Sequence, residues 1–165
     1  MQSTNTLIIG AGQCGLTMAK ALSDRGVDHL VLDGGRIAER WHTERWDSLR
    51  MLTPNWLNSL DGEAPKGFDP DGFMSAGEMA QVMNDFASAN SIEVKEETKV
   101  LSLRCSGIGY VVQTDQGAIS AENVVIATGA CAVPNIPNFS QDLGCYQMSS
   151  PVSYTHLTLP TTSRV

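Results

Sequence analysis

A glycine-rich turn near the N-terminus, Gly10-Ala11-Gly12-Gln13-Cys14-Gly15, has the residue types and spacing that could hold the phosphates of a dinucleotide. The turn follows an apolar run at 6–9 and opens a predicted helix at 13–24, and Asp33 ends the next apolar run, 29–32. In such a unit, the three glycines allow a tight bend, close approach of a pyrophosphate and packing of the helix on the strand. The helix N-terminus offers N–H groups to the phosphates, and the acidic residue can accept hydrogen bonds from a ribose hydroxyl. The alternative is a plain glycine-rich turn whose Asp33 only ends a strand.

The elements around this turn predict an α/β fold. Short apolar runs at 6–9, 29–32 and 124–127 are typical of strands buried in a parallel sheet. Further strands are predicted at 92–94, 99–103, 110–114 and 123–128, with glycine turns between them. We expect the region 92–120 to form a small antiparallel meander, and the strand at 123–128 to rejoin the parallel sheet.

A capping box, Ser75-x-x-Glu78, predicts the start of a helix over 75–89. Its stripe of Met79, Val82, Met83 and Phe86 has helical spacing, and core packing explains it better than a cofactor contact. The stretch 34–73 contains all three tryptophans and little periodicity, so we predict a long functional loop with short helical turns.

Composition excludes several classes of protein. The 165 residues are 42% hydrophobic and 18% charged, which is enough for a packed core, and the net charge of −7 argues against a nucleic-acid partner. No apolar run approaches the ~18 residues of a membrane span. The four cysteines form no CxxC pair, so no metal site is predicted, and free thiols in a cytoplasmic protein are the expected state.

Four segments in order along the chain carry a resemblance to a known family. They are the glycine-rich turn, the stretch from Glu39-Arg40-Trp41 to Trp56, the strand 124–129 with Pro134 and Pro137 after it, and Gln147–Ser150. Together they resemble the flavin-containing monooxygenase-like oxidoreductases, which use FAD and NAD(P)H. The resemblance covers about residues 1–150 and implies a Rossmann-like FAD-binding domain, with a parallel sheet, helices and a small β-meander, that is incomplete.

The resemblance implies a set of cofactor contacts. The adenosine and pyrophosphate half of FAD would be held by the turn and the strand end after it. Arg40 and Trp41 would lie near the pyrophosphate and ribityl chain, and Leu52 beside the isoalloxazine. The predicted cofactor-binding residues are Gly10, Gly12, Gln13, Cys14, Gly15, Asp33, Gly34, Arg40, Trp41, Leu52, Val100, Ala127, Thr128 and Gly129. Asn55 is the predicted catalytic residue, an amide near the reactive carbon of the flavin. Ala38 departs from the family pattern, which has glycine at this point in many relatives.

Simpler interpretations of the same loop stay open. Trp46 and Trp56 are expected to fill the core rather than contact flavin, and Asn55 after a proline could be an ordinary turn residue. Arg45 and Arg50 could be surface charges or pair with a local carboxylate such as Asp47.

The resemblance implies a parent enzyme that oxygenates a small-molecule substrate with NADPH as reductant. A flavin disulfide reductase and a non-catalytic dinucleotide-binding module are the alternatives, and a homodimer is left open. The sequence contains one GxGxxG turn, so we expect the NADPH site to lie outside this chain and the chain alone to be inactive. Residues 151–165 include the string SYTHLTLPT, which resembles a translated sequencing-adapter read-through, and are predicted to be a non-native tail.

Overall fold

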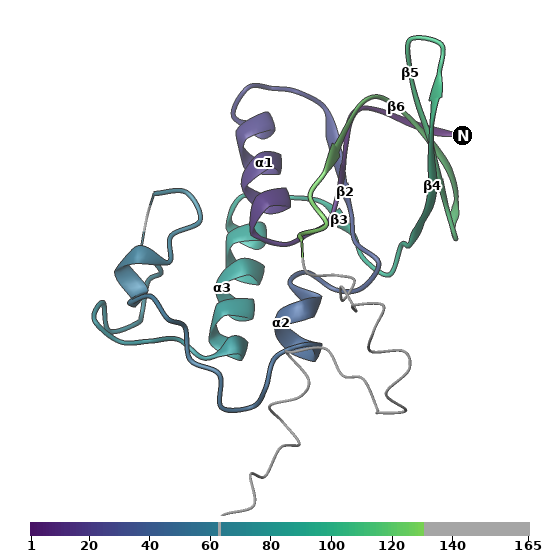
Figure 1. Ribbon diagram of the computed structural model, residues 1–165. Coiled ribbons are helices and arrows are strands. Elements are labelled where there is room, and N and C mark those ends of the chain that lie inside the picture. The colour runs from purple at the N-terminus through teal and green to yellow at the C-terminus, as the bar shows by residue number, and fades with distance from the viewer. Residues whose placement is uncertain (63, 131–165) are drawn as a thin grey trace, which may run out of the picture.

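The computed structural model describes residues 1–62 and 64–130, which form one twisted sheet with helices on one face (Figure 1). The strands are β1 (Gln2–Ile9), β2 (His29–Leu32), β3 (Val94–Lys95), β4 (Val100–Ser106), β5 (Gly109–Thr114) and β6 (Gly117–Ile126). The helices are α1 (Gln13–Ser23), α2 (Glu39–Thr43) and α3 (Ala76–Ala89), with a single 3₁₀ turn, η1 (Asn55–Leu57). The predicted tail, Pro134, Pro137 and the segment 147–150 lie outside the described residues.

The six strands are ordered β3-β2-β1-β6-β5-β4. Strand β1 is parallel to both β2 and β6, and β2 is parallel to β3, so the carboxyl ends of these strands meet at one edge. Strands β4 and β5 are antiparallel to their neighbours and form a meander with β6. The predicted fold, a Rossmann-like parallel sheet with a small meander, is therefore confirmed.

Two predicted strand boundaries are wrong. The strand near 92–94 lies at Val94–Lys95 and belongs to the parallel sheet rather than to the meander. The last strand begins at Gly117, not at 123, because residues 117–121 pair with β5 and residues from Ile119 onward also pair with β1. Alternating burial of Ile119 and Ala121 shows that this first half is a half-buried strand.

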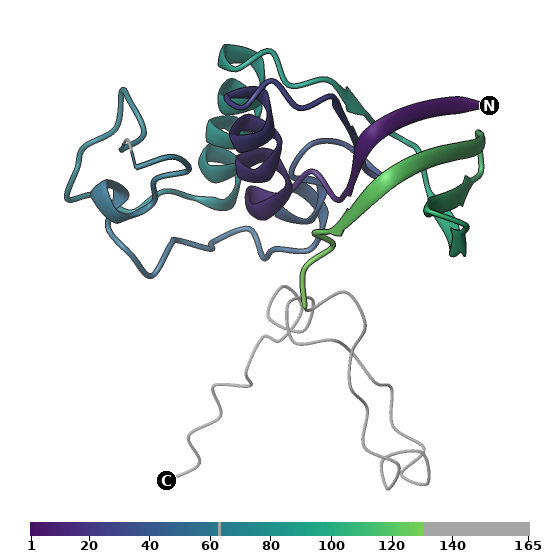
Figure 2. The same ribbon diagram turned by 90° about the horizontal axis from the view of Figure 1, so that it is seen from above.

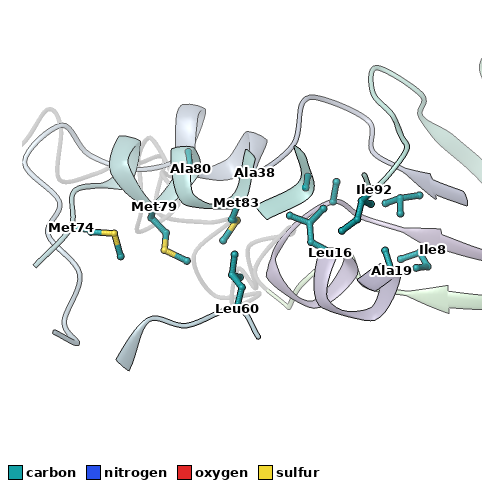
Figure 3. Close-up of a cluster of buried hydrophobic side chains, with 13 residues drawn as sticks. Ile8, Leu16, Ala19, Ala38, Leu60, Met74, Met79, Ala80, Met83 and Ile92 are labelled. Atoms are coloured by element: carbon teal, nitrogen blue, oxygen red, sulfur yellow. The ribbon is translucent and has the colours of Figure 1, made fainter. Parts of the chain in front are cut away.

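The hydrophobic core lies on both faces of the sheet. On one face, Ile8 and Val31 contact the helices, and Figure 3 shows Leu16 and Ala19 of α1 close to Ile8 and Ile92, with Met79 and Met83 of α3 extending this cluster. On the other face, Leu7 and Leu32 pack with Val112 and Ile119 of the meander. Seen from above, α1 and α3 run side by side next to the sheet (Figure 2). Within the described ranges, no helix is long and apolar enough to span a membrane.

Helix α3 begins as the capping box predicts. The Ser75 hydroxyl accepts a hydrogen bond from the backbone N–H of Glu78, and the Glu78 carboxylate accepts one from the backbone N–H of Ser75. Met79 and Met83 are buried and Val82 and Phe86 pack beside them, so the apolar stripe is core, as expected. Among the described residues of the loop 34–73, the helical elements are the short turns α2 and η1, as predicted. Trp56 is 55% exposed, so the expectation that it fills the core is wrong.

Candidate functional site

A groove of about 680 Å³ runs along the carboxyl ends of β1, β2 and β6, beneath α2 and at the start of α1. It contains most of the residues predicted to bind a cofactor: Gly10, Gly12, Gln13, Cys14, Asp33, Gly34, Arg40, Trp41, Val100, Ala127, Thr128 and Gly129. The edge where parallel strands end is where α/β proteins bind their ligands, since loops and helix N-termini converge there.

Each glycine of the turn has the geometry predicted for it. Gly10 adopts a φ of +112°, and a Cβ atom there would lie 2.5 Å from the carbonyl oxygen of Ala127. A Cβ on Gly15 would lie 1.8 Å from the carbonyl oxygen of Gly10, so the helix packs on the strand only without a side chain. A Cβ on Gly12 would meet nothing within 4 Å. Gly10 and Gly15 are therefore required by the fold, whereas the space at Gly12 is open to a ligand.

The N-terminus of α1 faces this open space with its backbone donors. Gly12 is the N-cap, no side chain caps the helix, and no acidic residue lies in the first turn. The N–H groups of the first turn therefore carry the partial positive charge of the helix without a competing carboxylate from the helix itself. An anion is the ligand that such a terminus favours.

Asp33 ends β2 and fixes the shape of the turn. Its carboxylate accepts a hydrogen bond from the N–H of Ala11 at 2.7 Å and another from the N–H of Gly35 at 2.9 Å. Each carboxylate oxygen has a second acceptor site, so Asp33 can still accept hydrogen bonds from the hydroxyls of a ribose. The adjacent wall contains Thr98 and Val100, at the start of β4.

Helix α2 forms another wall of the groove. Ala38, its N-cap, has a φ of +59°, a left-handed conformation that glycine adopts more readily, and its N–H donates to the carbonyl oxygen of Ala11. A glycine, which the family pattern predicts at this position, would fit this backbone without strain. From α2, the Arg40 guanidinium pairs with Glu44 at 2.5 Å and lies close to Gly129 across the groove. Trp41 lines the groove and also packs against the core.

Arg45 lines the groove too, although the sequence pattern did not assign it there. Its guanidinium carbon lies 4.9 Å from the centroid of the Trp41 ring. Among the described residues, Arg45 pairs with no carboxylate and its charge faces this ring, whereas Arg50 pairs with the carboxylate of Glu78. Arg45 lies two residues beyond the end of α2, so no helical spacing in the sequence indicates its contact with Trp41.

Leu52 and Asn55, the two residues predicted to lie beside the flavin ring, are not part of this groove. Leu52 is 98% exposed. The Asn55 amide is 5% exposed, donates to the carbonyl oxygen of Asp69 at 2.8 Å and accepts from the N–H of Met74 at 3.0 Å. In this structure, the Asn55 side chain therefore ties the loop 69–74 to η1.

The donor set of the groove fits a dinucleotide. It offers open space at Gly12, helix N–H groups for phosphates, a carboxylate for ribose and the cations Arg40 and Arg45. No group of three or more metal-ligating side chains is present among residues 1–62 and 64–130. The fold and the site together define a Rossmann-like dinucleotide-binding domain.

The chain belongs to the pyridine nucleotide-disulphide oxidoreductase family, whose model matches residues 7–156. A curated relative, described as an uncharacterised CzcO-like oxidoreductase from Geobacillus kaustophilus, is 36% identical over 140 residues, which is 84% of this chain and 40% of that protein. The chain thus spans less than half the length of this relative.

Solved structures of two kinds share the fold. A flavin-containing monooxygenase from Stenotrophomonas maltophilia has a TM-score of 0.72 and 23% identity, over 84% of this chain and 42% of that one. The bacillithiol disulfide reductase Bdr from Staphylococcus aureus has a TM-score of 0.71 and 19% identity, over 78% of this chain and 39% of that one. At these identities the likeness concerns the fold.

Proposed function

We propose that residues 1–150 are the FAD-binding part of a flavin-dependent NAD(P)H oxidoreductase of the monooxygenase-like kind. The observation that carries this proposal is the groove, where an open glycine turn, an uncapped helix N-terminus and a ribose-accepting carboxylate meet. These features suit a dinucleotide, and a flavin-containing neighbour with the same fold favours FAD over a plain nicotinamide dinucleotide.

In this proposal the chain's own residues bind and orient the cofactor. The N–H groups at the start of α1 bind the diphosphate, and Asp33 accepts hydrogen bonds from the adenosine ribose. The backbone of Val100 contacts the adenine, and Thr128 and Gly129 approach the phosphates from the end of β6. FAD, when bound, supplies the redox chemistry. Trp41, at the other wall, limits the access of water to that region.

The remaining functions of the enzyme are assigned to sequence that this chain does not span. Relatives are more than twice as long, and the nicotinamide cofactor, NADPH, would bind in their additional part. A small-molecule substrate would be bound there as well. The chain alone is accordingly proposed to bind FAD without turning over NADPH. Cys14 and Cys105 are free thiols, which fits a cytoplasmic location.

A flavin disulfide reductase is the second candidate. The fold shared with bacillithiol disulfide reductase favours it, and the family description is compatible with it. Its chemistry would need a reactive thiol or a disulfide substrate beside the flavin. Measuring NADPH-dependent oxygen uptake and NADPH-dependent disulfide reduction with the longer protein separates the two candidates. A non-catalytic dinucleotide-binding module would show neither reaction.

The experiment that tests the cofactor assignment uses the chain as it stands. The purified protein is titrated with FAD, and binding is followed by the flavin fluorescence and absorption. The proposal expects saturation at one FAD per chain, with competition by ADP, which shares the adenosine diphosphate half. Binding of neither FAD nor ADP would refute it.

A further inference from the structure

The groove contains a cation, Arg45, to which the proposed function gives no particular contact with the cofactor. Its ionisable side chains are Asp33, Glu39, Arg40 and Arg45, together with the thiol of Cys14. Glu39 pairs with Arg36, and Arg40 pairs with Glu44, so the charges of Glu39 and Arg40 are compensated locally. Within the described part of the chain, Arg45 forms no ion pair with a carboxylate, and its charge faces an aromatic ring.

We propose that Arg45, positioned by Trp41, binds the diphosphate of the cofactor in this groove. The inference rests on the proposed function, since it names a further residue for the same ligand. A diphosphate brings two negative charges to a site that already contains the Asp33 carboxylate, in a chain of net charge −7. The helix terminus supplies only about half a positive charge, and the charge of Arg40 is shared with Glu44, so Arg45 is the cation whose charge is left for this ligand.

The contact with Trp41 holds this cation in place, with the guanidinium carbon over the ring. N–H groups at the edge of a guanidinium held over a ring can donate hydrogen bonds to an anion. One N–H group of Arg45 donates a weak hydrogen bond to the backbone carbonyl oxygen of Glu44, at 3.4 Å. The remaining donors of Arg45 suit two oxygens of a phosphate, because its planar fork matches their geometry.

Trp41 is fixed in turn by its own surroundings, which makes it a positioning residue. Its backbone N–H donates to the carbonyl oxygen of Ala38 at 2.8 Å, and its ring packs against the core cluster beside α1 and α3. A pre-oriented arginine loses less rotamer freedom when the ligand binds. Trp41 therefore strengthens the arginine–phosphate contact without touching the phosphate.

The test measures how the affinity of the full chain depends on the phosphates of the ligand. FAD is titrated directly, and ADP and adenosine are measured as competitors, for the wild type and for Arg45→Gln. We expect Arg45→Gln to lower the affinity for FAD and ADP roughly tenfold to a hundredfold, as loss of a charged hydrogen bond would. The affinity for adenosine, which lacks the phosphates, should change less than about twofold. The salt dependence of FAD binding should also decrease in the variant, since one phosphate contact is lost.

Arg50→Gln is the matched control, since it removes the same charge at a position outside the groove. The Arg50 guanidinium donates hydrogen bonds to the carbonyl oxygen of Phe73 and to the carboxylate of Glu78. Its FAD affinity should stay within about twofold of the wild type. Trp41→Leu should also lower the affinity for ADP more than the affinity for adenosine. The double variant Trp41→Leu/Arg45→Gln should bind ADP no more weakly than Arg45→Gln alone.

The possible results distinguish a failure of this inference from a failure of the proposed function. A wild type that binds neither FAD nor ADP refutes the proposed function. A wild type that binds both, with Arg45→Gln binding them equally well, refutes the role of Arg45 alone. Equal losses for ADP and adenosine, or equal effects of Arg45→Gln and Arg50→Gln, would also refute it, because they indicate a general change of structure or charge.

Discussion

The carbonyl oxygen of Gly10 lies 1.8 Å from the position that a Cβ atom on Gly15 would occupy. The first turn of α1 thus packs directly on the turn that ends β1, and any side chain on Gly15 would displace it. Since the same turn and helix terminus form the floor of the groove, this contact links the stability of the fold to the shape of the site.

We therefore predict that Gly15→Ala destabilises the protein by roughly 1–3 kcal/mol, as overpacking of a close backbone contact does. The free energy of unfolding is measured by denaturant titration. Gly77→Ala is the control, because it is also a helical glycine but a Cβ there meets nothing within 4 Å. It should stabilise the protein slightly, by up to about 1 kcal/mol. Equal effects of the two substitutions would contradict the packing argument.

Asn55 should contribute to stability rather than to cofactor binding. Its buried amide makes hydrogen bonds to the backbone of Asp69 and Met74, and Asn55→Ala leaves both groups without this partner. We expect a loss of about 1–3 kcal/mol per group left unsatisfied, with FAD affinity of the folded protein unchanged. Asn84→Ala, on α3, loses one hydrogen bond within its own helix and should cost little. A stable Asn55→Ala variant with weakened FAD binding would instead support the contact expected from the family resemblance.

The capping box of α3 predicts a pH dependence of stability. Hydrogen bonds from the backbone N–H and the hydroxyl of Ser75 lower the pKa of Glu78 below its ordinary value of 4.5, and the charge of Arg50 lowers it further. Because the pKa is lower in the folded state, the stabilisation is present above the unfolded-state pKa and is lost as the pH falls through the folded-state pKa. The midpoint temperature of thermal unfolding should therefore be lower for Glu78→Gln than for the wild type at neutral pH. This difference in midpoint should shrink below about pH 4. Glu93→Gln, at an exposed position, controls for the lost charge, and a difference that is independent of pH would contradict this cause.

A left-handed residue after α3 offers a stabilising substitution. Ser91 is exposed and has a φ of +51°, a conformation that costs a residue with a Cβ about 1–2 kcal/mol. Ser91→Gly should raise the free energy of unfolding by about 0.5–1 kcal/mol, after the added flexibility of the unfolded chain is subtracted. Gly26, after α1, has a φ of +66°, which glycine adopts without strain, so Gly26→Ala should have the opposite effect. Loss of stability in Ser91→Gly would show that the serine side chain matters more than the backbone.

Features that depend on neighbouring residues could be predicted from the sequence. The strand–turn–helix unit around Gly12 and the cap at Ser75 follow from local spacing, and both are present as expected. Most residues of the groove were predicted because the glycine turn fixes where the strands end, and the family resemblance places the others.

Features that depend on distant contacts could not be predicted in this way. Asn55 is buried by hydrogen bonds to residues 14 and 19 positions away, and nothing in its local sequence specifies them. The first half of β6 could not be predicted because polar residues interrupt its strand pattern, and its pairing with β5 and with the start of β1 defines it. The place of Arg45 in the groove could not be predicted either, because its partner is the Trp41 ring rather than a carboxylate.

The central claim, that the open space at Gly12 receives a cofactor phosphate, is tested most directly by titrating Gly12→Asp with FAD beside the wild type. Aspartate is a favoured N-cap, so the variant should unfold at the same denaturant concentration as the wild type or slightly higher. Its side chain would occupy the phosphate position with a negative charge, so FAD affinity should fall by about a hundredfold or more while the wild type saturates at one FAD per chain. A folded Gly12→Asp variant that binds FAD as tightly as the wild type would contradict the account.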